Sequence, residues 1–266
     1  MENKLIVPTN NDEQPYVLED LDRLLARRRG YTFHTPTPDD SVVFIISGGL
    51  DSTIALHRVL NEIRCTVYPL YIKRGARSED SELNAIKHYM SLYSELFPEK
   101  LRPLTIIASE VPPKILKTNI TKDRLSTIGH PMRNAVLQSI SIQFAVAKSH
   151  EDQAEIKTVF TAISPDDMLP HCSLVALRAQ TLLACIDNGD WAWQITSPNL
   201  EPELWGDISK SDSIKYATQH KIPLDMTYTC TQGPTTACGI CPECHLRIEA
   251  FQQAGVPDPT EYGHTS

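Results

Sequence analysis

Residues 41–53 have the sequence SVVFIISGGLDST, and this stretch decides the fold. Its first part, SVVFII (41–46), is a continuous apolar and β-branched run, which is typical of a strand buried on both faces of a sheet. Two adjacent glycines follow, and from Asp51 to about Ile63 the pattern predicts a helix. A buried strand, a tight turn and a helix in direct succession predict a parallel α/β unit.

The same alternation continues along the chain. Further strands are predicted at 66–72, 104–109, 157–163 and 193–196, and further helices at 79–96, 134–148, 174–186 and 211–220. Strands separated by helices of this length predict a Rossmann-like parallel sheet with helices on both faces. We therefore expect an α/β domain over 41–229, preceded by a helical extension (1–40) and followed by a metal-binding segment (230–266). In the extension, the amphipathic stretch 17–29 ends in Arg27–Arg29, which is typical of a solvated helix end.

The glycine-containing loop has the features of a phosphate site. The two glycines let backbone N–H groups approach an anion, and the helix that follows adds its free amides and the positive end of its dipole. It is not a Walker A loop, because the chain has no Gly-x-x-x-x-Gly-Lys there. The alternative is an ordinary strand–helix turn capped by Asp51 or Ser52. The candidate phosphate-binding residues are Ser47, Gly48, Gly49, Leu50, Asp51, Ser52 and Thr53, three of which add hydroxyl donors.

Four of the seven cysteines crowd into one short segment, with the spacing C-x7-C-x2-C-x2-C. In a chain without an export signal, such crowding favours a metal over disulfides. Four thiolates predict a closed, tetrahedral structural zinc site. A redox-active pair, an iron–sulfur cluster, or His245 in place of one thiolate remain alternatives, whereas Cys65 and Cys185 are predicted to be core residues. The predicted ligands are Cys230, Cys238, Cys241 and Cys244.

Composition excludes several classes of protein. The chain has 266 residues, a hydrophobic content of 41% and a charged content of 22%, which are ordinary for a globular protein. No run of eighteen apolar residues is present, so no membrane span is expected. A net charge of -8 without any basic block disfavours a broad nucleic-acid surface. The N-terminus lacks the apolar region of a secretory signal, which predicts a cytoplasmic protein.

The string SGGLDST (47–53) resembles the signature of the PP-loop ATP pyrophosphatases, which have an adenine nucleotide alpha hydrolase (HUP) fold. Together with the tail CGICPECHLRIEAFQQAGVPDPTEY (238–262), it makes the chain similar to the QueC family of 7-cyano-7-deazaguanine synthases over about 41–262. The resemblance implies a ligase that uses ATP, Mg²⁺ and Zn²⁺. It would adenylate the carboxylate of 7-carboxy-7-deazaguanine and join it to ammonia, giving the amide and then the nitrile. It also implies a homodimer.

The resemblance assigns roles to individual residues. Asp51 is expected to help hold Mg²⁺, with Ser52 and Lys210 completing the catalytic set and Lys210 neutralising charge on the acyl phosphate. The segment 130–134 matches a Gly-Arg-Asn element of the family, so Arg133 is a candidate contact to phosphate or adenosine; a charge on a helix surface is the alternative. Asp167 and His171 lie in a stretch that corresponds to the region of the deazaguanine pocket, or else to a surface loop.

One departure from the family pattern bears on the substrate. After the second predicted strand the family carries Asp-Tyr-Gly-Gln-Arg-His, but residues 70–77 here are LYIKRGAR, with Arg74 as a candidate substrate contact. This basic loop indicates an altered substrate or acceptor site. It leaves open a divergent paralogue of an antiviral defence system that joins the activated acid to a protein amine. Another PP-loop RNA-modifying adenylase and a nucleotide sensor are further alternatives.

Overall fold

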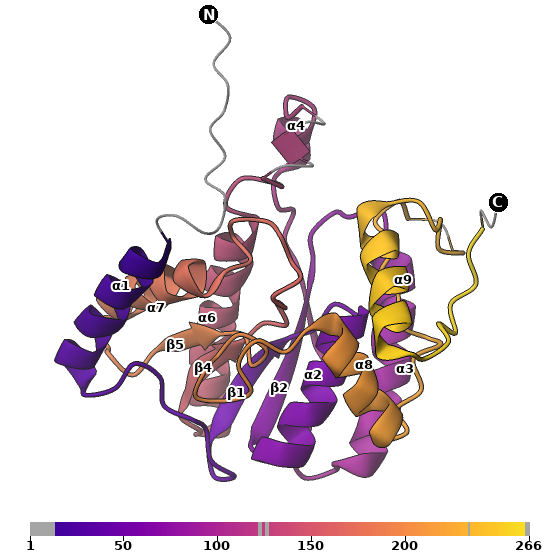
Figure 1. Cartoon of the computed structure of the whole chain (residues 1–266). Coiled ribbons are helices and arrows are strands. Elements are labelled where there is room, and N and C mark those ends of the chain that lie inside the picture. Colours follow the sequence, from indigo (N-terminus) through magenta and orange to yellow (C-terminus); the bar gives the residue numbers. More distant parts are fainter. Residues whose placement is uncertain (1–13, 122–123, 126–127, 234, 264–266) are drawn as a thin grey trace, which may run out of the picture.

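A computed structural model describes residues 14–121, 124–125, 128–233 and 235–263 (Figure 1). Its sheet has the strand order β3-β2-β1-β4-β5, and every neighbouring pair is parallel. After β1, the chain adds β2 and β3 on one side of this strand and then β4 and β5 on the other side. The direction of strand order therefore reverses between β1 and β4. Ligands of open α/β sheets bind at such a reversal, beyond the carboxyl ends of the strands. The strands are β1 (Ser41–Ile45), β2 (Thr66–Lys73), β3 (Thr105–Ala108), β4 (Ile156–Phe160) and β5 (Gln194–Thr196).

Helices cover both faces of the sheet, as the alternating pattern predicted (Figure 1). Val42 and Phe44 point into a core shared with one group of helices, and Val43 points into the core on the opposite face. The first group is α2 (Leu50–Arg58), the π-helical turn η1 (Val59–Ile63), α3 (Glu79–Leu96), α8 (Lys210–Gln219) and α9 (Pro242–Ala254). The opposite face carries α6 (Arg133–Asp152) and α7 (Leu174–Asn188), with α1 (Gln14–Arg29) packed on α7, while the short α4 (Lys114–Lys117) projects from the body.

Helix α9 was not predicted, because its few apolar residues gave no clear periodicity. Two boundary signals were nevertheless present: Pro242 stands in its first turn, and Gly255 ends it in the left-handed region. Ala250 and Phe251 are buried in the main core. Apolar packing therefore holds the segment that follows the cysteines, in addition to the metal predicted at the four thiols.

The helical extension docks through buried polar contacts. Arg178 of α7 is buried and donates to Asp22 of α1 at 2.8 Å and to both carboxylate oxygens of Glu201 at 2.7 Å. The interpretation of Arg27–Arg29 as a solvated helix end is wrong for Arg29. Its guanidinium donates to the carbonyl of Trp193 at 2.8 Å, because the end of α1 lies against the residues that lead into the edge strand β5.

Candidate functional site

The loop between β1 and α2 is shaped by close backbone contacts. Gly48 has φ +73, and a Cβ there would lie 2.7 Å from the carbonyl oxygen of Glu82. The carbonyl of Gly48 accepts a hydrogen bond from the N–H of Tyr228 at 2.9 Å. Gly49 is the N-cap of α2 and has an extended backbone. The turn is therefore packed between α3 and the segment before the cysteines, which leaves its amides at the carboxyl edge of the sheet.

The side chains of this loop divide into exposed and buried ones. Ser47 is exposed, and its hydroxyl lies 2.9 Å from the hydroxyl of buried Ser52. Leu50 packs into the core, and Thr53 is fully buried with its hydroxyl unpaired within the described chain. Ser47 therefore carries the exposed hydroxyl of the loop. The side chains of Leu50 and Thr53 are buried, so these two residues can offer a ligand only their backbone N–H groups.

Lys210 connects the loop to two other segments. From the first residue of α8, its ammonium donates to Asp51 at 2.8 Å, to Asp167 at 2.9 Å and to Ser164 at 3.0 Å. Its exposed fraction is 5%. Asp167 follows β4 and was predicted as a substrate residue, but here Lys210 joins it to Asp51, so that it meets two of the three predicted catalytic residues. We call Asp51, Asp167 and Lys210 the charged centre.

The charged centre carries more negative than positive charge. Burial raises the pKa of Asp51; the charge of Lys210 offsets part of this rise, and the charge of Asp167 adds to it. Burial alone would lower the pKa of Lys210, but the two carboxylates raise it above its ordinary value, so the lysine stays cationic. Oδ1 of Asp51 is buried and has no hydrogen-bond partner among the described residues. An unpaired carboxylate oxygen in surplus negative charge fits Mg²⁺, a hard cation that prefers oxygen ligands.

Glu243 is a member of this neighbourhood that the sequence did not reveal. It lies in the first turn of α9, between Cys241 and Cys244, and burial raises its pKa, as do the charges of Asp167 and Asp51. The one feature of the sequence that could have indicated Glu243 as a site residue is its position between two of the clustered cysteines. Only the docking of α9 brings this carboxylate within electrostatic reach of the charged centre.

Arg133 and His171, which were predicted as nucleotide and substrate contacts respectively, lie side by side in the structure. A terminal nitrogen of Arg133, the first residue of α6, lies 3.4 Å from Nε2 of His171, and its Nε donates to Asn134 at 3.3 Å. Burial and the charge of Arg133 lower the pKa of His171 to about 4, so this imidazole is neutral. Within the described chain the cation is thus bonded to neutral groups. A partly buried guanidinium in this state is available for an anion.

Arg74 is held by its own neighbours. Its two terminal nitrogens donate to the two carboxylate oxygens of Glu82, each at 2.8 Å, and Ser78 and Tyr71 also donate to that carboxylate. Its fork is therefore occupied, although its charge still lowers the pKa of Arg133 after the effect of burial. Arg74 is therefore a fixed charge whose electrostatic effect reaches Arg133.

The four predicted metal ligands converge. The sulfur atoms of Cys230, Cys238, Cys241 and Cys244 all lie within 4.8 Å of one another, and all four side chains are buried. Zinc–sulfur bonds of about 2.3 Å place the corners of a tetrahedron roughly 3.8 Å apart, which this cluster can accommodate with small shifts. His245 is exposed, so it does not complete the set. The donor set fits a structural zinc ion.

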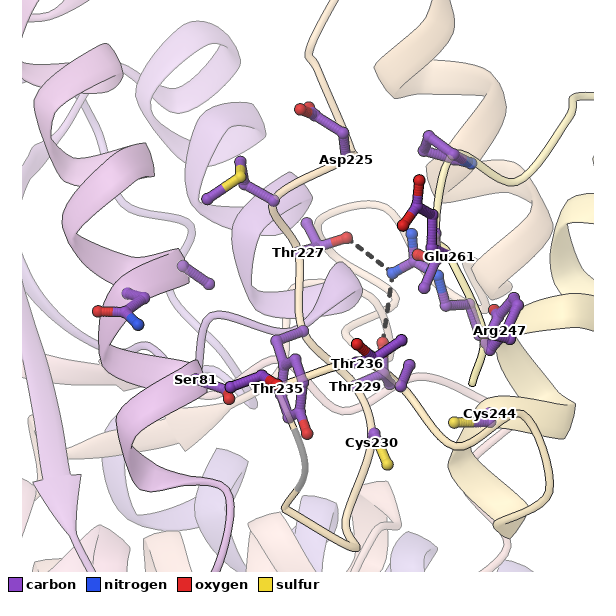
Figure 2. A pocket seen from close by; sticks show the side chains of 18 residues that line it. Ser81, Asp225, Thr227, Thr229, Cys230, Thr235, Thr236, Cys244, Arg247 and Glu261 are labelled. Atoms are coloured by element: carbon purple, nitrogen blue, oxygen red, sulfur yellow. Dashed lines mark hydrogen bonds between the residues drawn. The ribbon is translucent and has the colours of Figure 1, made fainter. Parts of the chain in front are cut away.

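A cavity of about 410 Å³ lies beside the cysteine cluster (Figure 2). It is bounded by α3, residues 225–230 and 235–237, α9 and the tail. Its wall contains buried Arg247, which donates to Thr227 at 2.7 Å. Asp51, Lys210 and Arg133 do not line it. The cavity is therefore distinct from the charged centre.

The fold and the site together define a parallel α/β protein with a phosphate-type loop and a four-cysteine centre. Residues 41–255 match the family described as "Queuosine biosynthesis protein QueC", so the chain belongs to this family, as its motifs predicted. Among its curated relatives, the 7-cyano-7-deazaguanine synthase of Oceanobacillus iheyensis is 27% identical over 83% of this chain and 97% of the relative. The synthase of Acetivibrio thermocellus is 28% identical over 83% and 96%, respectively.

Among solved structures, an NH3-dependent NAD synthetase from Campylobacter jejuni is similar with a TM-score of 0.43 and 12% identity, covering 79% of this chain and 75% of that one. Because this score is below 0.5, the family assignment depends on the sequence match. None of the helices in the described part of the chain is long and apolar enough to cross a membrane.

Proposed function

We propose that the protein is an ATP-dependent carbon–nitrogen ligase that converts 7-carboxy-7-deazaguanine to 7-cyano-7-deazaguanine. Membership of the QueC family and the printed activity of its relatives support the reaction class. The observation that carries the proposal is the charged centre, because it sets Lys210 against Asp51 directly beside a phosphate-type loop. ATP cleavage needs such a combination of anion-binding amides and fixed charge.

The reaction follows from the poor reactivity of a carboxylate. A carboxylate oxygen attacks the α-phosphorus of ATP, a new oxygen–phosphorus bond forms, and pyrophosphate leaves toward the amides of residues 47–53. The resulting acyl adenylate is an electrophile that ammonia attacks at the acyl carbon, which releases AMP and gives the amide. A second ATP activates the amide oxygen in the same way, and loss of AMP and protons leaves the nitrile. Lys210 would offset negative charge near the phosphates, and Mg²⁺ held by Asp51 would supply further charge neutralisation.

A second acceptor is favoured by one observation. The loop LYIKRGAR (70–77) differs from the family pattern, and its Arg74 is committed to Glu82. A changed loop at the substrate side is compatible with an acceptor larger than ammonia, namely an amine on a protein. Such a ligase would stop after one adenylation, because an amide to a protein needs no dehydration.

The decisive experiment combines the protein with ATP, Mg²⁺, ammonia and 7-carboxy-7-deazaguanine. We expect AMP to appear, with two AMP formed for each molecule of nitrile detected by mass spectrometry. If a co-purifying protein instead gains the mass of the deazaguanine acyl group, the acceptor is an amine on that protein and not ammonia. If substrate-dependent AMP does not form under any of these conditions, the proposed function is wrong.

Asp51→Asn tests the charged centre. We expect the variant to release AMP at least about 100-fold more slowly than the native protein, the scale at which a positioned electrostatic group contributes to a transition state. The matched control is Asp212→Asn on α8, whose carboxylate pairs with the half-exposed Lys215. It should change the rate less than twofold. A native rate for Asp51→Asn would remove this residue from the mechanism.

A further inference from the structure

Lys210 is contacted by two consecutive aspartates of the segment that follows β4. Its ammonium donates to Asp167 at 2.9 Å, and its backbone N–H donates to a carboxylate oxygen of Asp166 at 2.6 Å. Both aspartates are partly buried. The side chain and the backbone of one lysine are therefore held from a single segment, whose two aspartates lie 43 and 44 positions earlier in the chain.

The backbone bond completes the start of α8. Lys210 is the first residue of this helix, so its N–H has no partner within the helix. The side chain of the N-cap, Ser209, accepts instead from the N–H of Asp212 at 3.1 Å. Asp166 provides the acceptor that the cap does not, and its negative charge is also favoured at the start of a helix. Asp166 therefore ties the first residue of α8 to the segment after β4.

Both ends of this bond are held by further contacts. On one side, the N–H of Ser164 donates to the carboxylate of Asp167 at 2.9 Å, and the N–H of Asp167 donates back to the carbonyl of Ser164 at 3.1 Å. The segment is thus a tight turn, and Ser164 is completely buried. On the other side, α8 packs against α2, the helix that carries Asp51 (Figure 1). Loss of the Asp166 bond would therefore free Lys210 to move relative to Asp51.

We propose that Asp166 is a positioning residue, which sets the place of the Lys210 ammonium through the backbone of α8. A lysine side chain is long and flexible, so the place of its ammonium depends both on its backbone and on the groups that receive it. Asp51 and Asp167 receive the ammonium, and Asp166 fixes the backbone. A displacement of about 1 Å in a reacting site can cost about 100-fold in rate. For the reaction that Lys210 serves, this inference rests on the proposed function.

Two variants separate the hydrogen bond from the charge. Asp166→Asn loses the charge but keeps an oxygen that can accept the N–H of Lys210, whereas Asp166→Ala loses both. We expect Asp166→Ala to lower kcat for substrate-dependent AMP formation about 10- to 100-fold, while KM for ATP changes less than about threefold. Asp166→Asn should stay within about threefold of native in both quantities. The matched control is Asp212→Ala, which removes a carboxylate from the first turn of the same helix and should leave kcat within about twofold of native.

A measurement without turnover tests the position of the ammonium itself. Lys210 is 5% exposed, so acetic anhydride should label it more slowly than the exposed Lys87 of α3. Mass spectrometry of the labelled peptides gives the ratio of the two labelling rates. We expect Asp166→Ala to raise the ratio of Lys210 to Lys87 labelling at least about threefold, because the start of α8 opens more often. Asp166→Asn and Asp212→Ala should leave this ratio native.

A native kcat or a native labelling ratio in Asp166→Ala overturns the inference. It is also overturned if Asp166→Asn loses as much kcat as Asp166→Ala, because the carboxylate would then act through its charge. The same holds if Asp212→Ala reproduces the effects of Asp166→Ala, since those effects would then come from a weaker helix start. Native protein that forms no AMP contradicts the proposed function alone, and the labelling ratios still test the position of Lys210.

Discussion

At the scale of single residues, Glu82 governs two features of the site. Its backbone carbonyl faces Gly48 of the phosphate-type loop, and its carboxylate fixes Arg74. Burial would raise the pKa of Glu82, but its bonds to Arg74 and neighbouring hydroxyls lower it, so the carboxylate stays charged. One residue of α3 thus sets both the shape of the loop and the position of a cation.

The adjacent glycines of the loop provide a matched pair for a stability prediction. Gly48→Ala places a Cβ 2.7 Å from a backbone oxygen at φ +73. We expect it to lower the free energy of unfolding by at least about 2 kcal/mol, because the left-handed region and the contact are both unfavourable. At Gly49 the nearest atom would be 3.4 Å away, so Gly49→Ala should cost no more than about 1 kcal/mol. Equal midpoints in urea denaturation would contradict this account of the turn.

At the scale of elements, several charged residues of the site stand where helices begin. Lys210 is the first residue of α8, Arg133 the first of α6, and Glu243 lies in the first turn of α9. The first turns have backbone N–H groups without helical partners, so they also favour anions. The site is consequently an assembly of helix starts around the loop after β1.

The docking of α1 gives a second matched pair. Leu25 is completely buried, whereas neighbouring Leu24 is 37% exposed. We expect Leu25→Ala to destabilise the protein by about 2–5 kcal/mol, and Leu24→Ala to change stability by no more than about 0.5 kcal/mol. Limited trypsin digestion after Arg27 and Arg28, which are exposed, should accelerate for Leu25→Ala alone. Indistinguishable digestion of the two variants would mean that α1 is not held by Leu25.

At the scale of the whole molecule, the cysteine cluster is coupled to the phosphate-type loop. The segment leading to Cys230 donates from Tyr228 to Gly48, and the cluster encloses the turn that carries Glu243. A metal that fixes these four cysteines would therefore hold both the loop and the charged centre in place.

Metal analysis tests this coupling. We expect about one zinc ion per native chain, as a closed four-thiolate site implies. Cys241→Ser should reduce the zinc content and lower the thermal midpoint, since metal binding contributes to folding. Cys172→Ser, a partly buried cysteine outside the cluster, should keep its zinc. Iron, with absorption near 400 nm in the native protein, would instead identify an iron–sulfur cluster.

Local sequence determined the α/β class, the strand–loop–helix unit at 41–53, the four cysteines and the family. These features depend on hydrophobic period, turn chemistry and short spacings, which are encoded within a few residues of each other. The boundaries of several elements could be predicted to within a few residues for the same reason. Helix α9 could not, because its burial comes from contact with a core built elsewhere in the chain.

Only the tertiary structure decided which charges meet. Asp51 and Lys210 are 159 positions apart, and their ion pair exists because the strand order brings the loops after β1 and β4 to one edge beside the start of α8. The same packing moved Asp167 from a predicted substrate contact into the charged centre and added Glu243 to its surroundings. Spacing along the chain cannot encode such pairs, since it does not fix how distant helices dock on the sheet.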